Sequence, residues 1–215
     1  MRLYHYLSAK HALEDIRCSR LKVARLDDIN DPFELWSSGQ RNKKVRAALR
    51  HWKAEMAKQH GMLCFSAGWK NPLLWSHYAD RHRGICLGFD VDESCVAKIN
   101  YVNRRVDVAL PISEDDIRSF LFTKFSDWSY EAERRCWVRL SDMESLSGYF
   151  FKNFDTSLRL CEVIAGPLYQ RTRGEIDDAL KNYHYRVFVV KARLAFTRFS
   201  VVQDKLGFRQ AIASS

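Results

Sequence analysis

The stretch Asn71–Val91, NPLLWSHYADRHRGICLGFDV, is the densest polar and aromatic segment of this chain of 215 residues. Its Asn-Pro start is typical of the first turn of a helix, so residues 71–80 predict a short helix. The apolar run that begins at Gly84 predicts a strand through Val91. Along the rest of the chain, predicted strands and short helices alternate in the same way but at irregular intervals.

Further strands are predicted where apolar and β-branched residues cluster, at 2–8, 21–26, 61–67, 101–110 and 185–194. Helices are predicted at 9–20, 113–125 and 173–183, and Ser113 opens the second of them with acidic residues in its first turn. The strands look two-sided rather than uniformly apolar, which favours an α+β fold over a doubly wound parallel sheet. The length predicts a single domain over 1–215.

The composition is that of a folded protein, with 47% apolar and 13% aromatic residues. The longest apolar runs are far too short to span a bilayer, and the first residues lack the apolar segment of a secretory signal. We therefore expect a cytoplasmic protein with no membrane partner. Six cysteines are spread along the chain without a C-x-x-C pair or a histidine-rich cluster, which predicts reduced thiols and no metal.

The formal net charge of +9 favours polyanionic partners. Part of the excess lies in residues 41–60, where apolar residues recur at helical spacing and predict an amphipathic helix with a basic outer face. The candidate nucleic-acid contacts on that face are Lys43, Lys44, Arg46 and Arg50. The face is either simply solvated or contacts nucleic acid.

The segment DWSYEAERRCW, Asp127–Trp137, holds the clearest candidates for catalysis. The chain has no glycine-rich phosphate loop, dinucleotide fingerprint, nucleophile elbow or zinc-protease motif, so any catalysis must come from dispersed polar residues. Read as a strand, the segment places Glu131 and Glu133 on one face, about 6–7 Å apart at their Cα atoms. Two carboxylates so close can differ in pKa and take different roles.

The same segment has a purely structural interpretation. Glu131 and Glu133 can pair with Arg135 and Arg139, which share their face of the predicted strand, as an ordinary charged surface. Arg134 lies alone on the opposite, otherwise apolar face, so its partner needs an explanation. Spacing alone leaves both interpretations open.

Side chains in the opening stretch suit a ligand that is planar and carries phosphate. Trp75, His77 and Tyr78 can stack on such a ligand or form hydrogen bonds with it. Arg81 and Arg83 can hold a ribose or a phosphate. The structural alternative is a helix-to-strand corner with buried aromatic residues.

Two other segments hold ligand candidates. Asn30 and Glu34 lie in the turn NDPFE, which either only reverses the chain or directs a carboxylate into a cleft. His5 lies on the first predicted strand next to Tyr6. A histidine in that position is either a satisfied structural residue or a ligand contact.

Taken in order, several segments resemble a mostly bacterial family catalogued as domain of unknown function 2971. They are LYHYLS, LKVARLDDINDPFE, GMLCFS, NPLLWSHYADRHRGICLGFDV, WSYEAERR and CEVIAGP, and the resemblance runs from about Leu3 to Lys191. That family's pattern is in turn similar to the ADP-ribosyltransferase fold, in which a split mixed or antiparallel β-sheet with short flanking helices binds NAD in a cleft.

The resemblance implies roles for residues of this chain. His5 would contact the ribose of NAD, Tyr78 would stack on nicotinamide, and Glu133 would be catalytic with Glu131 as its helper. A carboxylate beside the ribose stabilises the oxocarbenium charge that develops when the N-glycosidic bond breaks. The sequence lacks a clear Ser-Thr-Ser strand motif, and Tyr78 falls in a predicted helix.

The resemblance therefore predicts an NAD-dependent ADP-ribosyltransferase that modifies nucleic acid or protein. It implies a toxin or antiphage defence effector with an antitoxin as partner, with NAD consumed as a substrate and no metal required. The alternative is a nucleic-acid-binding or nuclease-like module that uses the basic helix at 41–58, with His77 and Arg81 as its local pair.

Overall fold

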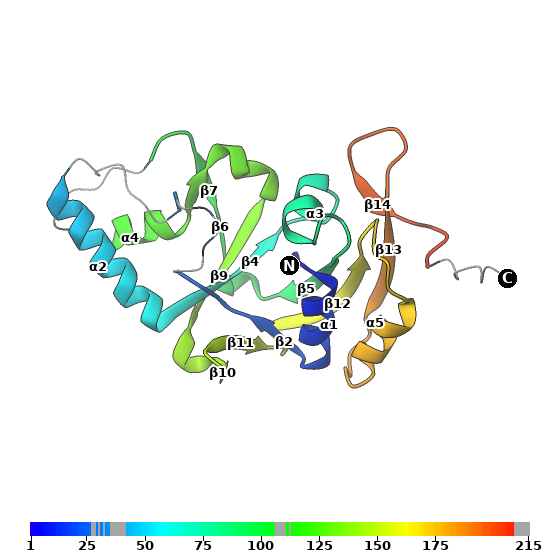
Figure 1. The fold of residues 1–215 in the computed structure, drawn as a ribbon. Helices are drawn as coiled ribbons and strands as arrows, with labels where there is room; N and C mark the ends of the chain where they lie inside the picture. The colour runs from blue at the N-terminus through cyan, green and yellow to red at the C-terminus, as the bar shows by residue number, and fades with distance from the viewer. Residues whose placement is uncertain are drawn as a thin grey trace. The chain divides into compact units, whose positions relative to one another are not determined.

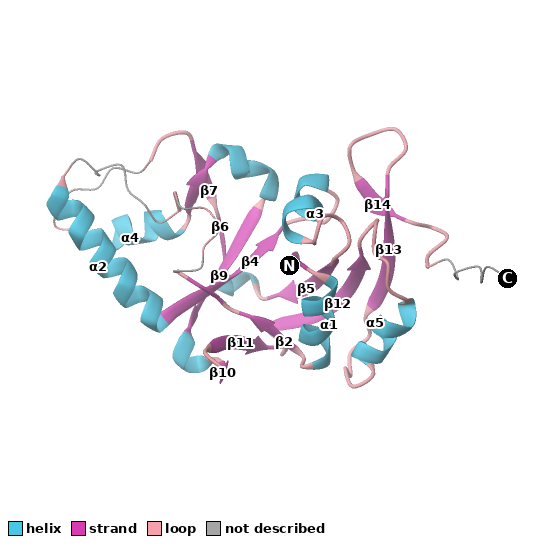
Figure 2. Ribbon diagram, in the orientation of Figure 1, coloured by secondary structure: helices cyan, strands magenta, loops and turns pink. Residues whose placement is uncertain are grey.

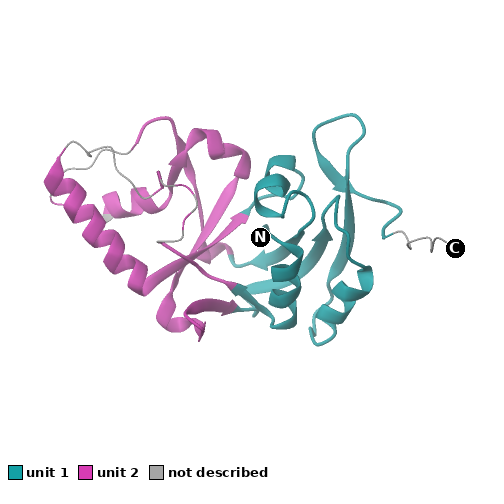
Figure 3. Ribbon diagram, in the orientation of Figure 1, with its two compact units in different colours: residues 1–21, 66–92, 153–215 teal, residues 22–65, 93–152 magenta. Residues whose placement is uncertain are grey.

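The computed structural model describes residues 1–26, 29, 31, 33–34, 42–105, 111 and 113–208. Its fold is α+β, with a mixed β-sheet and a few helices, as the pattern of elements predicted. Figure 3 colours two compact units into which the chain divides. Unit 1 consists of residues 1–21, 66–92 and 153–215, and unit 2 of residues 22–65 and 93–152. The single domain over 1–215 stays a prediction.

The sheet of unit 1 has the strand order β14-β13-β12-β5-β1 (Figure 1). The strands are β1 (Arg2–Leu7), β5 (Ile85–Val91), β12 (Leu158–Ala165), β13 (Phe188–Leu194) and β14 (Val201–Gln203). Neighbouring strands are antiparallel except β12 and β13, which are parallel. A parallel pair requires a crossover, and the connection between these two strands carries α5 (Arg173–Leu180).

The helices of unit 1 begin where the sequence predicted. Ser8 Oγ accepts a hydrogen bond from the His11 amide at the start of α1 (Ala9–Arg17), and Asn71 Oδ1 accepts one from Leu73 at the start of α3 (Pro72–Tyr78). Helices α1 and α5 contact each other beside the strands (Figure 2). Their inward residues and those of β1, β5 and β12 form a buried apolar core.

Unit 2 contains a second group of strands with the order β4-β9-β6, and β3 pairs with β4. Its strands are β3 (Ala24–Arg25), β4 (His60–Ser66, with Ser66 assigned to unit 1), β6 (Val96–Lys98), β7 (Asn100–Val102), β8 (Thr123–Phe125), β9 (Glu133–Arg139), β10 (Glu144–Leu146) and β11 (Tyr149–Asn153, with Asn153 assigned to unit 1). Strand β2 (Arg20–Lys22) lies where the chain passes from unit 1 to unit 2. Short 3₁₀ helices occupy Glu93–Cys95 (η2), Ser126–Glu131 (η3) and Leu140–Asp142 (η4).

The basic helix predicted at 41–60 is confirmed as α2 (Lys43–Gln59), and Asn42 caps its start. Its apolar residues Val45, Leu49 and Ala57 are buried with Met62 of β4 and with residues of α4 (Glu114–Leu121). A stripe of buried residues at helical spacing is what keeps such a short amphipathic helix folded in water.

Several predicted elements have other bounds in the structure, and three of these differences concern unit 2 near the site. The helix predicted at 113–125 ends at Leu121, because Thr123–Phe125 pair with β7 as the parallel strand β8. Of the strand predicted at 101–110, only Tyr101 and Val102 belong to β7; Asn103 to Arg105 lie outside a strand, and 106–110 lie outside the described residues. The predicted strand through Glu131 begins only at Glu133, since η3 and a left-handed residue precede it.

Among the glycines that the structure describes, Gly84 leaves the least room for a side chain next to backbone atoms. A Cβ atom built there would lie 2.1 Å from the Leu7 carbonyl oxygen and 2.8 Å from the Ala79 carbonyl group. The same glycine donates a hydrogen bond of 2.7 Å to Ala79 O and accepts one from the Gly166 amide, so the backbone has little room to move.

We expect Gly84→Ala to lower the free energy of unfolding by at least about 1–3 kcal/mol, the usual cost of overpacking. Chemical denaturation measures this, and Gly68→Ala is the matched control, because a Cβ there meets nothing within 4 Å. Equal stability of the two variants would contradict the close approach at Gly84.

Candidate functional site

A cluster of five charged side chains lies buried inside unit 2. The members of this buried ion cluster are Glu34, Lys124, Glu131, Glu133 and Arg135, and none of them is more than 5% exposed. Buried charges of this number are unusual, because each one loses its hydration and must recover the lost free energy from partners.

Lys124 lies at the centre of the buried ion cluster. Its ammonium nitrogen is 2.9 Å from Glu34 Oε1, 2.6 Å from Glu131 Oε2 and 3.1 Å from Glu133 Oε2. The ring centroid of Trp128 lies 5.1 Å from the same nitrogen, within the range of a cation–π contact. One lysine therefore connects the carboxylate of Glu34 with the two carboxylates of the Glu-x-Glu segment.

Arg135 completes the cluster from β9. Its Nη2 is 2.5 Å from Glu34 Oε2, and its Nε donates to Glu133 Oε1 at 2.7 Å. The remaining Nη1 donates to the carbonyl oxygen of Leu121 at 2.9 Å, so all three guanidinium nitrogens have acceptors. Such charge-assisted bonds fix both oxygens of Glu133 in place.

Local backbone geometry brings the two glutamates of the Glu-x-Glu sequence onto one lysine. Glu131 is the last residue of η3, Ala132 has φ 45° in the left-handed region, and Glu133 is the first residue of β9. The amide of Glu133 donates to the Tyr101 hydroxyl at 2.8 Å. The predicted shared orientation of the two glutamates is therefore present, but it comes from a turn rather than from a continuous strand.

The cluster contains three carboxyl side chains and two basic ones. Burial alone would raise the pKa of Glu133, but Arg135 and Lys124 outweigh burial, so the pKa lies below the ordinary value of a glutamate. Burial would lower the pKa of Lys124, and its carboxylate neighbours reverse this and raise it. Both groups are therefore charged at neutral pH.

A cavity of about 280 Å³ lies beside the cluster in unit 2. Glu34 and Lys124 belong to its lining, and so do Asp31, Phe33, Val102, Asn103, Arg104, Arg105, Phe120, Thr123 and Phe125. The Arg105 guanidinium lies 4.7 Å from the ring centroid of Phe33. The cavity therefore combines a buried carboxylate and ammonium with apolar rings and two arginines.

Glu34 is held toward the cluster by the short turn that precedes it. Asp31 is buried, its Oδ1 accepts a hydrogen bond of 2.8 Å from the Phe33 amide, and its carbonyl oxygen accepts one of 3.0 Å from Glu34. This is the hydrogen-bonded turn that an aspartate favours. The prediction that the NDPFE turn directs a carboxylate inward agrees with this geometry, while Asn30 lies outside the described residues.

The predicted ligand residues Tyr6 and Trp75 lie in the core of unit 1. Trp75 has no exposed surface, its indole nitrogen donates to Trp69 O at 2.6 Å, and its ring meets Tyr6 edge-on at 5.3 Å. The Tyr6 hydroxyl donates to Gly68 O at 3.1 Å. Both rings therefore have complete structural roles in this unit.

The other ligand candidates of unit 1 lie nearer its surface. His77, Arg81 and Arg83 are exposed, and His5 and Tyr78 are half-buried. Arg81 belongs to a tight turn in which three successive residues have positive φ, 45° to 70° at Asp80 to His82. The predicted catalytic residues Glu131 and Glu133 belong to unit 2, so each unit contains only some of the residues of the predicted NAD site.

The basic residues Lys43, Lys44 and Arg50 of α2 are exposed, and Arg46 is half-buried, as the amphipathic pattern predicted. Arg134 is half-buried and donates to the carbonyl oxygens of Ala132 and Glu133 at 3.3 and 3.1 Å. Its partners are thus backbone groups of the turn before β9.

Lys124 and the two arginines of the cavity are not among the site residues that the sequence predicts. The predicted helix at 113–125 includes Lys124, although a single lysine within the run FLFTKF is the kind of residue that needs a buried partner. The predicted strand at 101–110 includes Arg104 and Arg105, and two adjacent arginines are a signal that the sequence offers for contact with an anion.

Within the described part of the chain, His, Cys, Asp and Glu side chains form no group that could hold a metal ion. In the buried ion cluster, Lys124 and Arg135 already engage the carboxylates. The described residues also contain no helix that is long and apolar enough to cross a membrane.

Comparisons of the chain with models of protein families, with characterised proteins and with solved structures gave no match. The site must therefore be interpreted from its own geometry.

We expect Lys124→Met to lower the free energy of unfolding by about 3–5 kcal/mol, because it leaves three buried carboxylates with a single cation. Chemical denaturation measures the loss. Lys58→Met is the matched control, since Lys58 also pairs with a glutamate, at 2.7 Å, but is largely exposed, and it should change stability little. Similar losses in both variants would contradict the central role of Lys124.

The pKa of Glu133 also predicts how stability depends on pH. A carboxyl group with a lowered pKa in the folded state stabilises the protein above its unfolded pKa, near 4.3, and this contribution disappears as the pH falls through the folded pKa. We therefore expect the stability difference between the wild type and Glu133→Gln to be largest near neutral pH and to shrink below about pH 4. Denaturation at several pH values measures it, and a constant difference would be the contrary result.

Proposed function

We propose that this protein is an ADP-ribosyltransferase that uses NAD as its substrate, with the buried ion cluster and its cavity as the reacting part of the site. The observation that carries the proposal is the excess of buried carboxylates over cations beside a cavity of about 280 Å³. A negative site of this kind suits a reaction in which positive charge develops on the substrate.

ADP-ribosyl transfer is a reaction in which positive charge develops on the substrate. The bond between the ribose C1′ and the nicotinamide nitrogen breaks, and its electron pair stays with nicotinamide, which leaves as a neutral molecule. The ribose then carries oxocarbenium charge until an oxygen or nitrogen of the acceptor attacks C1′ and loses its proton to a carboxylate. Carboxylates lower the free energy of the charged state and can also accept the proton.

Glu34 is the carboxylate that we assign to the ribose, since it belongs both to the cluster and to the cavity lining. Glu133 and Glu131 contact Lys124, and Glu133 also contacts Arg135. In the proposal these two act on the reaction through Lys124, whose ammonium links them to Glu34. This assignment changes the roles that the family resemblance implied, because it moves the contact with substrate from Glu133 to Glu34.

The volume of the cavity limits how much of the NAD molecule it can hold. Ligand pockets commonly measure about 300–1,000 Å³, so a cavity of about 280 Å³ suits the nicotinamide–ribose half of the dinucleotide. Phe33 offers an exposed ring for the planar nicotinamide, and Arg104 and Arg105 offer guanidinium groups for a phosphate. A macromolecular acceptor, a role as toxin or antiphage effector and an antitoxin partner follow only from the family resemblance.

Release of nicotinamide from NAD tests the proposal directly. We expect the purified protein to release it when RNA, DNA or lysate protein is supplied as acceptor, and Glu34→Gln to slow this by roughly 100-fold or more, as when one preorganised charge-stabilising group is lost. Chromatography measures the free nicotinamide, and radiolabelled NAD shows which acceptor is modified.

The control is Glu162→Gln, which removes a half-buried glutamate that pairs with Arg2 at 2.9 Å in unit 1. It should leave the rate unchanged, and thermal unfolding should verify that both variants are folded. Absence of nicotinamide release by the wild type with every acceptor would overturn the proposal, as would equal rates for Glu34→Gln and the wild type.

A nucleic-acid-binding module is the second candidate function. The exposed basic residues Lys43, Lys44 and Arg50 of α2 favour it, because their charges are available to phosphates. This function is compatible with the first, since nucleic acid is one class of acceptor for ADP-ribose.

A further inference from the structure

Two phenylalanines project into solvent from the hairpin that joins β13 and β14 in unit 1. Phe196 is 90% exposed and Phe199 is 100% exposed. The hairpin itself is well held, because Ala195 donates to Ser200 O at 2.9 Å and Val201 donates to Lys70 O at 2.8 Å. Rings that an ordered hairpin holds fully in water indicate a surface that is covered by a partner.

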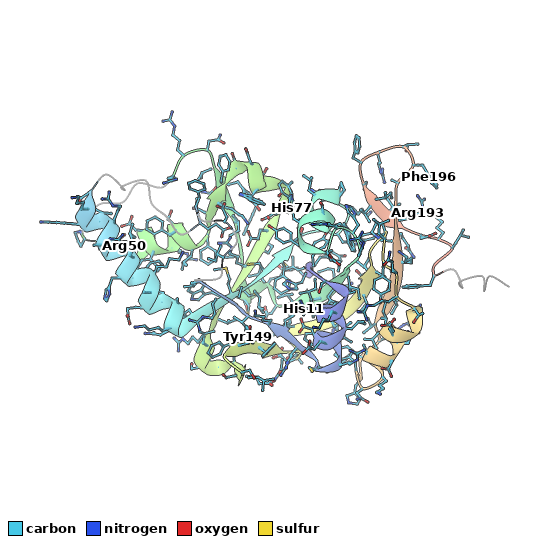
Figure 4. The ribbon with its side chains drawn as sticks, in the orientation of Figure 1. His11, Arg50, His77, Tyr149, Arg193 and Phe196 are labelled. Atoms are coloured by element: carbon cyan, nitrogen blue, oxygen red, sulfur yellow. The ribbon has the colours of Figure 1, made fainter. Side chains whose placement is uncertain are left out.

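Arginines accompany these aromatic rings along β13 and the hairpin. The Arg193 guanidinium lies 4.3 Å from the ring centroid of Phe196, and Figure 4 labels both residues on the hairpin. At the other end of β13, the Arg186 guanidinium lies 5.0 Å from the ring centroid of Phe188, which is 54% exposed. Arg198 is also exposed, between Phe196 and Phe199.

The charge of this region has a single sign. From Lys181 to Gln203 the chain has five Lys or Arg residues and no Asp or Glu. Three of the five form local bonds: Lys191 donates to the carbonyl oxygens of Gly166, Pro167 and Ala192, Arg193 Nη1 donates to the Leu194 carbonyl oxygen at 2.9 Å, and Lys181 pairs with Asp178. A bond to a neutral carbonyl group leaves the charge of Arg193 in place, so the charges of Arg193 and Arg198 can attract a partner that is negatively charged.

We propose that this strip of unit 1 binds single-stranded nucleic acid. The aromatic–arginine strip lies on the hairpin and consists of Arg193, Phe196, Arg198 and Phe199. Unstacked bases would lie on the phenylalanine rings, and the guanidinium groups would contact the phosphates that follow the bases. Aromatic rings combined with a basic track are the means by which proteins bind single strands without reading a duplex groove.

The mixture of rings and charges on the hairpin favours nucleic acid over an anionic membrane. Arg198 lies between Phe196 and Phe199, and the Arg193 guanidinium lies against the Phe196 ring, so insertion of the rings into a membrane would carry charged groups toward its apolar region. A single strand of nucleic acid presents bases and phosphates together and can contact both kinds of group.

Fluorescence anisotropy with labelled oligo(U) and oligo(dT) tests the proposal on the full chain, without NAD. We expect the double variant Phe196→Ser, Phe199→Ser to raise Kd by roughly 5- to 150-fold for each stacked base that is lost. Arg193→Ser with Arg198→Ser should also reduce the dependence of log K on log salt concentration, by roughly 0.7 for each phosphate contact removed.

Leu206→Ser is the matched control, because Leu206 is 71% exposed in unit 1 but lies outside the strip, and its Kd should equal that of the wild type. Lys44→Ser with Arg50→Ser removes exposed charge from α2 instead. If these α2 changes abolish binding while the phenylalanine variant binds normally, the strip is not the binding surface and the proposal fails.

Vesicles of anionic lipid supply the remaining comparison. Binding to vesicles that depends on Phe196 and Phe199, without binding to either oligonucleotide, would overturn the proposal, and so would binding to neither. Because NAD is absent, failure here would leave the proposed transferase activity standing, and failure of nicotinamide release would leave this proposal standing.

Discussion

The contact between Lys124 and its three carboxylates is the constraint on which the organisation of unit 2 depends. Without it, the three buried carboxylates of Glu34, Glu131 and Glu133 would have Arg135 as the one cation left in the cluster, and removing one partner from a buried ion network costs several kcal/mol. The turn at Asp31–Glu34, the end of η3 and the start of β9 must therefore all meet β8. Local backbone preferences are secondary to this requirement, as the left-handed Ala132 indicates.

A cluster of this kind is poorly explained by stability alone. Replacing a buried ion network with apolar side chains of similar volume is often neutral or stabilising, so such a network is weak evidence of a structural purpose. The cluster also contains three carboxylates and two cations, and it lies beside a cavity that Glu34 and Lys124 both line. Perturbed and unbalanced charges next to a cavity are typical of sites that bind or transform a ligand.

The sequence predicted local features well and non-local ones poorly. The starts of α1, α2 and α3 follow from Ser8, Asn42 and Asn71, whose side chains cap the helix within a few residues. Glu131 and Glu133 could also be selected, because their spacing is local. A lysine in the run FLFTKF indicates a buried partner, and two of its partners, Glu131 and Glu133, lie only 7 and 9 residues away, but its third partner, Glu34, lies 90 residues away and could not be identified from the sequence. The α+β class was predictable, whereas the ends of α4 and β9 depend on these distant contacts.

The two proposals assign opposite uses of charge to the two units. In unit 2, negative charge is buried, where low polarity strengthens its effect on a developing cation and where a small substrate can be shielded from water. In unit 1, positive charge and aromatic rings are exposed on a hairpin, where a long and flexible polyanion can reach them. A transferase that modifies nucleic acid needs both properties. Neither property requires the other, so nicotinamide release and binding of single-stranded nucleic acid can be measured separately. If the protein shows both, nucleic acid is the acceptor that the two proposals together identify.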